Sequence, residues 1–305
     1  MNSAALGGAT ARRTSLVVPA LLAVYLIWGS TYLAIRWALV SFAPFFQMGT
    51  RFLAAGALLM AWAICRRSPM PTLAEWRNAL VLGTLMLGGG YGLTAVAEQT
   101  IGSGLVAAFI AVSPIWMCGW GLLFGQRPTR GELAGIAVGA VGVLLLVRGA
   151  SFSASPGGMA CVAAATVLWT LGSVLQVAKL PLAAGAMGYA SEMLCGGAML
   201  MVFSLATGEQ FAWPPEPLAA LAWAYLLVFG SLLGFSAYLY LLANASPAMA
   251  SSYAFVNPVI ALFLGVALGG EAVRGGEWIA CGVILSGVFL IFRGKSASAP
   301  QRAAR

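Results

Sequence analysis

Long apolar runs dominate the chain, and short polar segments separate them. Ten of these runs have about the 20 residues that a helix needs to cross a hydrocarbon core about 30 Å thick. They cover residues 16–38, 44–65, 78–97, 102–124, 131–148, 157–178, 185–207, 218–242, 248–268 and 277–293. The separators are rich in proline, glycine and arginine, and none is long enough to hold a soluble domain. We therefore expect an all-α integral membrane protein with ten transmembrane helices.

The composition of the chain agrees with this pattern. Of the 305 residues, 61% are hydrophobic and only 8% are charged, whereas soluble domains carry about 25% charged residues. The mean hydropathy is +0.93. A soluble fold of this length could not bury so much apolar surface, so lipid is the expected solvent for most of the chain.

The positive charges give the expected orientation. With ten spans and a cytoplasmic N-terminus, Arg36, Arg148 and Arg274 fall outside the cell, and Arg51 falls inside a span. The other Lys and Arg residues are cytoplasmic: Arg12, Arg13, Arg66, Arg67, Arg77, Arg127, Arg130, Lys179, Arg293, Lys295, Arg302 and Arg305. This asymmetry follows the positive-inside rule. It predicts a multi-pass protein of a bacterial inner membrane with cytoplasmic tails at residues 1–15 and 295–305.

The net charge of +8 therefore reflects the orientation of the protein in the membrane. Because the basic residues lie in short loops, we expect no nucleic-acid partner. A cleaved signal peptide is an alternative interpretation of the first run. That run continues through residues 28–38 without a small-residue cleavage site, which favours a retained helix.

Cysteine, histidine and aspartate usage excludes several kinds of site. The chain has no His and no Asp, and its five Cys residues have no CxxC spacing. We expect buried free thiols, no bound metal and no cofactor. Proteolysis by an Asp dyad or a Ser-His pair is excluded, and no GxSxG motif occurs. The sequence therefore predicts that the protein is not an enzyme.

Glycine spacing points to helix packing. Gly131, Gly135 and Gly139 form successive GxxxG steps in the fifth run, a pattern typical of closely packed membrane helices. A phosphate-binding loop is absent, because Gly294-Lys295-Ser296 lacks the first glycine of the motif. ATP-driven transport by this chain alone is therefore not expected.

The two halves of the sequence resemble each other at a nearly constant offset. Trp28 and Trp169 lie 141 residues apart, and the same offset relates Arg51 to Glu192. Ser113-Pro114 corresponds to Asn257-Pro258 at an offset of 144. These matches predict five-helix repeats at residues 16–149 and 157–294. Because five is odd, the second repeat enters the membrane from the opposite side, so the repeats are inverted and enclose a central cavity.

Several short motifs occur in a characteristic order. They are Ile27-Trp28-Gly29-Ser30-Thr31-Tyr32, Arg51-Phe52, Ala97-Glu98-Gln99, Ser113-Pro114, Asn257-Pro258 and Gly270-Glu271. Together they resemble the drug/metabolite transporter superfamily, in its EamA-type ten-helix exporter branch, over residues 16–293. The resemblance implies export of amino acids or related metabolites, and the aromatic amino acid and threonine exporters are similar bacterial types.

Inverted repeats favour a transporter that works by alternating access, since two similar packings of the halves expose one site to each side in turn. We expect a secondary transporter exporting small metabolites, with amino acids as the first candidates. Alternatives are an exporter of drugs or other metabolites, a passive channel-like facilitator and a lipid scramblase. The expected partners are the small-molecule substrate and membrane lipids, with the protein a monomer or a weak homodimer.

Three charged residues in or beside the spans are candidates for the transport site. Arg51 lies about seven residues into the second run, where a lipid-facing Arg would cost about 2.5–3.5 kcal/mol. It is interpreted as a carboxylate-binding or gating charge, or equally as a structural ion pair. Glu192 is a possible proton carrier or a partner of Arg51. Glu98 could bind a substrate ammonium or a proton, or could be an interfacial loop carboxylate that caps the next helix.

Aromatic and polar side chains at mid-span depth are the expected cavity lining, because such groups usually line a cavity or join helices. The candidates are Trp28, Thr31, Tyr32, Tyr91, Ser113, Trp169, Ser173, Tyr238, Tyr253 and Asn257. Pro114 and Pro258 lie at mid-depth and free a backbone carbonyl one turn earlier. They are interpreted as hinges of gating helices or, alternatively, as inherited packing kinks.

Overall fold

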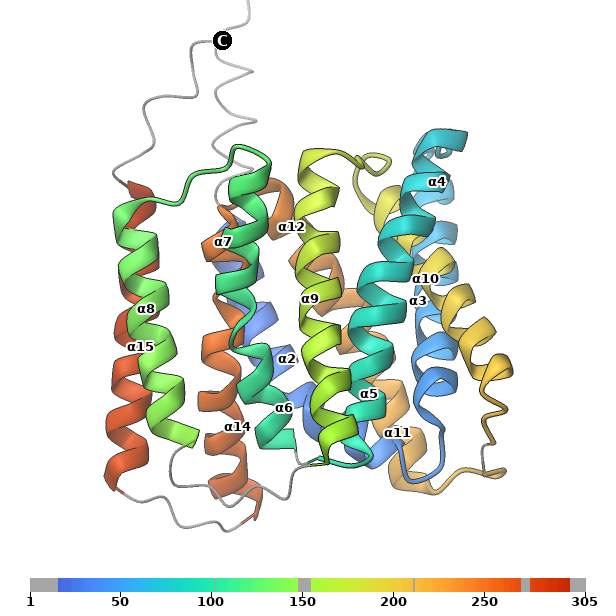
Figure 1. Cartoon of the computed structure of the whole chain (residues 1–305). Helices are drawn as coiled ribbons and strands as arrows, with labels where there is room; N and C mark the ends of the chain where they lie inside the picture. Colours follow the sequence, from blue (N-terminus) through green and yellow to red (C-terminus); the bar gives the residue numbers. More distant parts are fainter. Residues whose placement is uncertain (1–15, 102, 148–154, 211, 270–274, 297–305) are drawn as a thin grey trace, which may run out of the picture.

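A computed structural model of the chain describes residues 16–101, 103–147, 155–210, 212–269 and 275–296 (Figure 1). All regular secondary structure in these segments is helical. The expected tail at residues 1–15 and residues 297–305 of the other tail lie outside the described residues. Arg148 and Arg274, which the charge pattern placed outside the cell, also lie outside them.

The helices fall on every apolar run of the sequence. The first half contains α2 (Val17–Ala38), α3 (Pro44–Cys65), α4 (Leu73–Leu82), the π-helix η1 (Gly83–Gly92), α5 (Leu93–Glu98), α6 (Ser103–Ile110), α7 (Ser113–Leu123) and α8 (Arg130–Val147). The second half contains α9 (Pro156–Ala178), α10 (Ala186–Ala206), α11 (Pro217–Tyr225), the π-helix η2 (Leu226–Phe235), α12 (Ser236–Asn244), α13 (Pro247–Ser251), α14 (Tyr253–Gly269) and α15 (Gly275–Ser296). The expected all-helical class is thus confirmed for the described residues.

Six helical rods in the described residues are long and apolar enough to cross a membrane. They are Val17–Ala38, Pro44–Cys65, Leu73–Glu98, Pro156–Ala178, Ala186–Ala206 and Pro217–Asn244. These rods belong to the first three runs of each half. In the other four runs, the described helices fall short of the same criteria of length and hydropathy.

One helix boundary differs clearly from the expected one. The third run was expected to be helical from residue 78, but α4 begins at Leu73. A capping box explains the difference. The Thr72 hydroxyl accepts a hydrogen bond from the Glu75 N–H at 3.3 Å, and the Glu75 carboxylate accepts one from the Thr72 N–H at 2.7 Å. The Thr-x-x-Glu signature of a helix start was therefore present in the sequence, outside the apolar run.

The third long rod of each half contains a π-helical segment. The segments η1 and η2 each have 10 residues and begin at Gly83 and Leu226. Their starts are 143 residues apart, within the range of offsets found in the sequence. Since π-helix is rare and concentrates at functional sites, its occurrence at equivalent places in both halves marks these rods as related.

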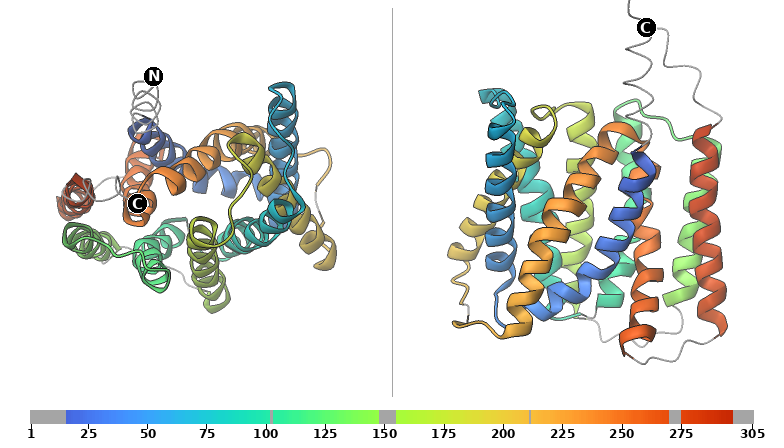
Figure 2. Two further views of the ribbon diagram at one scale, coloured as in Figure 1. Left: turned by 90° about the horizontal axis from the view of Figure 1, so that it is seen from above. Right: turned by 180° about the vertical axis from the view of Figure 1, so that it is seen from behind.

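The two halves pack against each other through several pairs of helices, with one helix of each pair from each half. Helix α3 of the first half packs on α10 of the second, η1 packs on α9, and α2 packs on α11, η2, α12 and α14. Helices α8 and α15 form a further pair at one edge of the bundle (Figure 2). The interface between the halves therefore runs through the whole molecule.

Glycines let the backbones of α8 and α15 come very close. A Cβ atom on Gly287 would lie 2.5 Å from the backbone nitrogen of Gly139, and one on Gly131 would lie 2.7 Å from the Cα of Gly294. Neither position has room for a side chain. The close packing expected from the GxxxG steps of the fifth run is thus confirmed.

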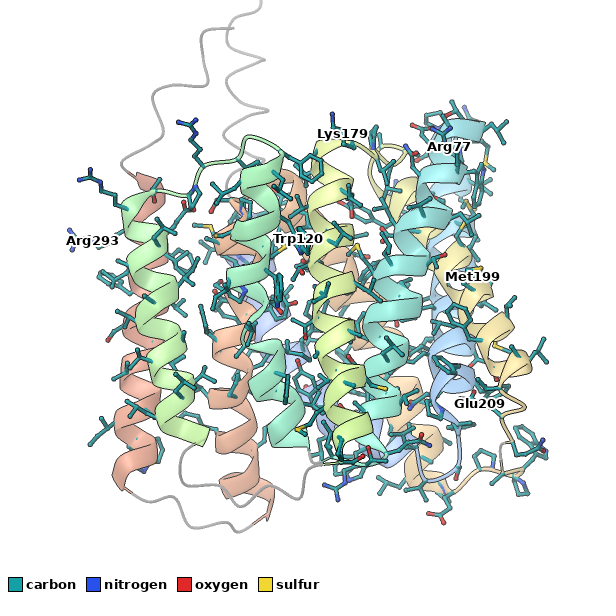
Figure 3. The ribbon with its side chains drawn as sticks, in the orientation of Figure 1. Arg77, Trp120, Lys179, Met199, Glu209 and Arg293 are labelled. Carbon is teal, nitrogen blue, oxygen red and sulfur yellow. The ribbon has the colours of Figure 1, made fainter. Side chains whose placement is uncertain are left out.

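Labelled charged residues gather at opposite ends of the bundle (Figure 3). Arg77, Lys179 and Arg293 lie toward the end drawn uppermost, while Glu209 lies toward the other end. The charge pattern assigned the first three to cytoplasmic segments and Glu209 to an outer segment, and this orientation stays a prediction.

Candidate functional site

Aromatic rings from both halves meet in the centre of the bundle. The Trp28 ring on α2 lies 5.5 Å from Trp169 on α9, 5.0 Å from Tyr238 on α12 and 4.8 Å from Tyr253 on α14, between ring centroids. Tyr91 of η1 lies 5.3 Å from Trp169. Most of these contacts are edge-to-face or tilted, geometries that favour aromatic pairs. The rings thus form a rigid cluster at the junction of the two halves.

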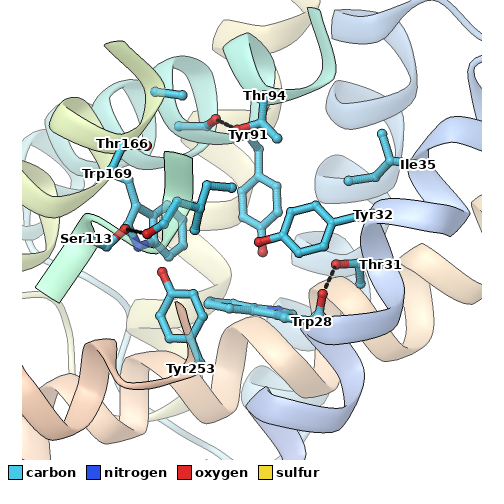
Figure 4. A pocket seen from close by; sticks show the side chains of 13 residues that line it. Trp28, Thr31, Tyr32, Ile35, Tyr91, Thr94, Ser113, Thr166, Trp169 and Tyr253 are labelled. Carbon is cyan, nitrogen blue, oxygen red and sulfur yellow. Dashed lines mark hydrogen bonds between the residues drawn. The ribbon is translucent and has the colours of Figure 1, made fainter. Parts of the chain in front are cut away.

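A cavity opens beside this cluster (Figure 4). Its empty volume is about 500 Å³, which includes space open to the surroundings. Its lining residues are Trp28, Thr31, Tyr32, Ile35, Gly90, Tyr91, Thr94, Ile110, Ser113, Ala165, Thr166, Trp169 and Tyr253. Of the candidates named from sequence, Trp28, Thr31, Tyr32, Tyr91, Ser113, Trp169 and Tyr253 line it.

Sequence reasoning missed Thr94, Ile110, Ala165 and Thr166 of the lining, although a signal was present for two of them. Thr94 follows Tyr91 by three residues, and Thr166 precedes Trp169 by three. Residues at this spacing share one helix face. Thr94 and Thr166 could therefore have been predicted from the helix faces that carry Tyr91 and Trp169.

Three further candidates lie behind the lining. The Ser173 hydroxyl and the Tyr238 hydroxyl are hydrogen-bonded at 2.8 Å. The Asn257 side-chain amide donates a hydrogen bond to the Tyr32 hydroxyl at 3.3 Å. Tyr238 packs directly on the Trp28 and Trp169 rings. The structure thus places Ser173, Tyr238 and Asn257 where they hold lining residues in position.

Arg51 adjoins the cavity without lining it. The residue is fully buried, and its guanidinium group lies 5.0 Å from the centroid of the Tyr91 ring and 4.7 Å from that of Phe52. All three guanidinium nitrogens lack a hydrogen-bond partner among the described residues. Contact with aromatic faces is favourable for a cation, but it leaves every N–H donor unused.

Two buried carboxyl groups complete the set of charged candidates. Glu98 is 7% exposed and Glu192 is fully buried, and neither carboxylate accepts a hydrogen bond from the described residues. The interpretation of Glu98 as an interfacial loop carboxylate that caps the next helix is therefore wrong, since Glu98 is a buried residue at the end of α5. Glu192 likewise forms no hydrogen bond with Arg51.

Comparison with known proteins assigns the chain to a family. The profile of the EamA-like transporter family matches residues 15–148 and residues 156–293. The chain belongs to this family. It is 42% identical over 277 residues to the inner membrane transporter YedA of Escherichia coli K12, with 90% of each chain covered. The family resemblance noted in the sequence is thereby confirmed.

More distant relatives of this EamA-family protein are also transporters by name. The S-adenosylmethionine/S-adenosylhomocysteine transporter of Chlamydia trachomatis serovar L2 is 28% identical, with 87% of this chain and 86% of the relative covered. A crystal structure with a TM-score of 0.73 covers 93% of this chain and 99% of its own, at 21% identity, which shows a likeness of fold alone. The protein is a multi-pass membrane transporter, and the expectation that it is not an enzyme is confirmed.

The two prolines of this EamA-family transporter lie in different settings. Pro114 is near the start of α7, beyond a break that follows Ile110, and the Ser113 hydroxyl donates a hydrogen bond to the Ile110 carbonyl at 2.6 Å. Ile110 is the residue whose carbonyl a proline at position 114 leaves free, so Ser113 satisfies it. Pro258 lies inside continuous α14. The helix is interrupted at Ser252, between α13 and α14. The interpretation of the two prolines as hinges or packing kinks stays a prediction.

The cysteines of the transporter form no disulfide bonds, and their expected burial is only partly correct. Cys118 and Cys281 are buried, Cys161 and Cys195 are half-buried, and Cys65 is exposed. Within the part of the chain that the structure describes, no group of three or more His, Cys, Asp or Glu side chains is arranged to bind a metal.

Proposed function

We propose that this protein is a secondary transporter that exports small metabolites, amino acids first among them, across a bacterial inner membrane by alternating access. The aromatic cavity between the two halves carries the proposal. It is built by α2, η1, α5, α6 and α7 from one half and by α9 and α14 from the other. A site shared by two halves can be exposed to either side when the halves change their packing.

Three observations support ten spans arranged as inverted five-helix repeats. One family profile matches two successive segments of the chain. The helix pairs that join the halves are reciprocal, because α2 packs on η2 and α9 packs on η1. The π-helices η1 and η2 occupy equivalent positions. An inverted arrangement of similar halves gives two packings of similar energy, as alternating access requires.

The substrate class follows from the lining and its surroundings. Aromatic rings with a few hydroxyl groups suit a solute with an apolar or aromatic body, and buried charges of both signs lie next to it. A relative is named as a transporter of S-adenosylmethionine, itself an amino acid derivative with an aromatic base. An exporter of non-amino-acid metabolites is the second candidate, favoured by the predominance of apolar groups in the lining.

Counterflow in proteoliposomes tests the proposal. Vesicles loaded with each of the twenty amino acids in turn are given a trace of the same labelled solute, with and without a pH gradient. A carrier accumulates label transiently, whereas a channel-like facilitator only lets gradients dissipate. Transient accumulation of at least one amino acid is expected. If none of the twenty amino acids accumulates but another metabolite does, the substrate is that metabolite and not an amino acid.

The orientation is tested by labelling single cysteines in intact cells. In a cysteine-free background, Glu209→Cys should react with an impermeant maleimide from outside, whereas Lys179→Cys should react only after permeabilisation. Both residues lie at the ends of the bundle, on opposite sides (Figure 3). The reverse pattern would place the termini outside the cell, and labelling of both from one side would contradict a membrane crossing by α10, which lies between them.

A further inference from the structure

Two opposite charges lie close together beside the aromatic cavity. Arg51 on α3 contacts the face of Tyr91, and Tyr91 lines the cavity. The Glu98 carboxyl interacts electrostatically with two guanidinium groups, that of Arg36 first and that of Arg51 second. It also interacts with the cavity residue Tyr32. Both charged groups are buried, and neither makes a hydrogen bond with the described residues. The pair is thus near enough to interact, but its hydrogen-bonding capacity is unused.

A third polar group belongs to the same place. Gln47 precedes Arg51 by four residues on α3, so the two side chains share a helix face. Gln47 is fully buried, and neither its side-chain oxygen nor its side-chain nitrogen has a hydrogen-bond partner among the described residues. The sequence had not identified this residue. An amide with free donors one turn from an arginine provides additional N–H groups toward an anion.

Such an arrangement is costly unless something completes it. Buried charges in proteins are normally paired and hydrogen-bonded, and buried amides are normally satisfied. Here a cation, a carboxylate and an amide all lack hydrogen-bond partners among the described residues. The cation lies against the lining residue Tyr91, and the carboxylate interacts with the lining residue Tyr32. Arginine recognises carboxylates through paired N–H groups, and a carboxylate recognises an ammonium group. The complementary ligand therefore carries one carboxylate and one ammonium.

We propose that Arg51, Gln47 and Glu98 form a subsite for the zwitterionic head group of the substrate. Arg51 and Gln47 bind the carboxylate, and Glu98 binds the ammonium. The rings around Trp28 receive the side chain of the substrate. This inference rests on the proposed transport function, but it adds a chemical requirement that transport alone does not impose: both charged groups must be present on one solute.

Binding is measured separately from transport, by the thermal stability of the purified protein in detergent, because a ligand that binds the folded state raises the unfolding midpoint. The twenty L-amino acids are screened first. The most effective one is then compared with its decarboxylated amine and its deaminated acid, which for phenylalanine are phenethylamine and 3-phenylpropanoate. Each analogue should need roughly tenfold or more higher concentration for the same shift, because it leaves a buried charge unpaired.

Substitutions separate recognition from folding. Arg51→Gln should remove the advantage of the amino acid over its amine, while the advantage over the acid persists. Glu98→Gln should do the opposite. Gln47→Leu should weaken the binding of the amino acid and of the acid, but not the binding of the amine. A purely structural role would reduce binding of all three compounds alike. Arg77→Gln, which removes an exposed arginine, should change none of these ratios.

The possible results distinguish this inference from the proposed function. The zwitterion subsite would be overturned if the amine and acid analogues bind as well as the parent amino acid, even if counterflow is observed. It would also be overturned if the binding ratios between these compounds are unchanged in Arg51→Gln and Glu98→Gln. A midpoint that no amino acid raises would overturn it as well. Selective binding without counterflow would leave the subsite in place and contradict the carrier mechanism.

Discussion

Trp28 and Trp169 occupy equivalent positions in the two halves and touch each other at the centre of the molecule. Their ring centroids are 5.5 Å apart, and the ring planes are inclined by 74°. Each indole also rests on a glycine of the opposite half. A Cβ atom on Gly234 would lie 2.6 Å from Trp28 Nε1, and one on Gly90 would lie 3.0 Å from Trp169 Cε3. The contact between the halves is therefore reciprocal at the cavity.

Gly234→Ala is expected to lower transport, because the new methyl group would displace the Trp28 indole from the cavity wall. The nearest atom belongs to the rigid indole ring, so the ring must move as a whole. Solute counterflow in proteoliposomes measures the effect. Gly119→Ala is the control, since a Cβ atom there meets nothing within 4 Å. Equal transport in the two variants would show that the position of Trp28 is not critical.

Arg51→Ala is expected to lower transport without blocking membrane insertion. The guanidinium is buried against Tyr91 and uses none of its N–H donors in the described fold, so the helices lose no hydrogen bond when it is removed. Transport is measured by counterflow and insertion by the amount of protein in the membrane fraction, with Arg77→Ala as the control. If Arg51→Ala transports as fast as the unmodified protein, the role of Arg51 is structural only.

Gly287→Ala is expected to destabilise the α8–α15 pair by about 1–3 kcal/mol, the usual cost of overpacking. The added Cβ atom would meet the backbone of Gly139 at 2.5 Å, and backbone cannot move aside as a side chain can. Gly282→Ala on the same helix is the matched control, because a Cβ atom there meets nothing within 4 Å. Unfolding of both variants in detergent gives the difference. Similar midpoints would contradict the close packing.

Glu209→Ala is expected to cost about 0.5–2 kcal/mol, as for the loss of a helix cap. The carboxylate of Glu209 accepts hydrogen bonds from the backbone N–H groups of Phe45 and Phe46, at 2.9 and 2.8 Å, in the first turn of α3. A residue of the second half thus caps a helix of the first. Glu216→Ala in the same loop is the control, since its side chain makes no cap. Detergent unfolding should separate the two variants.

Local features of the sequence were sufficient for much of the fold and part of the site. The apolar runs located the helices, because lipid requires each spanning backbone to satisfy its own hydrogen bonds. Depth and helix face identified Trp28, Tyr91 and Trp169. The same reasoning could not assign Ser173 and Asn257 to positions behind the lining, because that depends on how each helix is rotated in the bundle. It also did not identify Gln47, whose significance depends on the absence of partners.

The sequence by itself determined the solvent of this protein, the approximate helices and the relation between its halves, because hydropathy and repeated motifs are properties of the chain alone. The tertiary structure decided which side chains meet. Whether Glu98 is buried, whether Glu192 reaches Arg51 and where Glu209 finds its hydrogen bonds all depend on contacts between segments far apart in sequence. Such contacts are fixed by the packing of whole helices, and no local pattern along the chain specifies that packing.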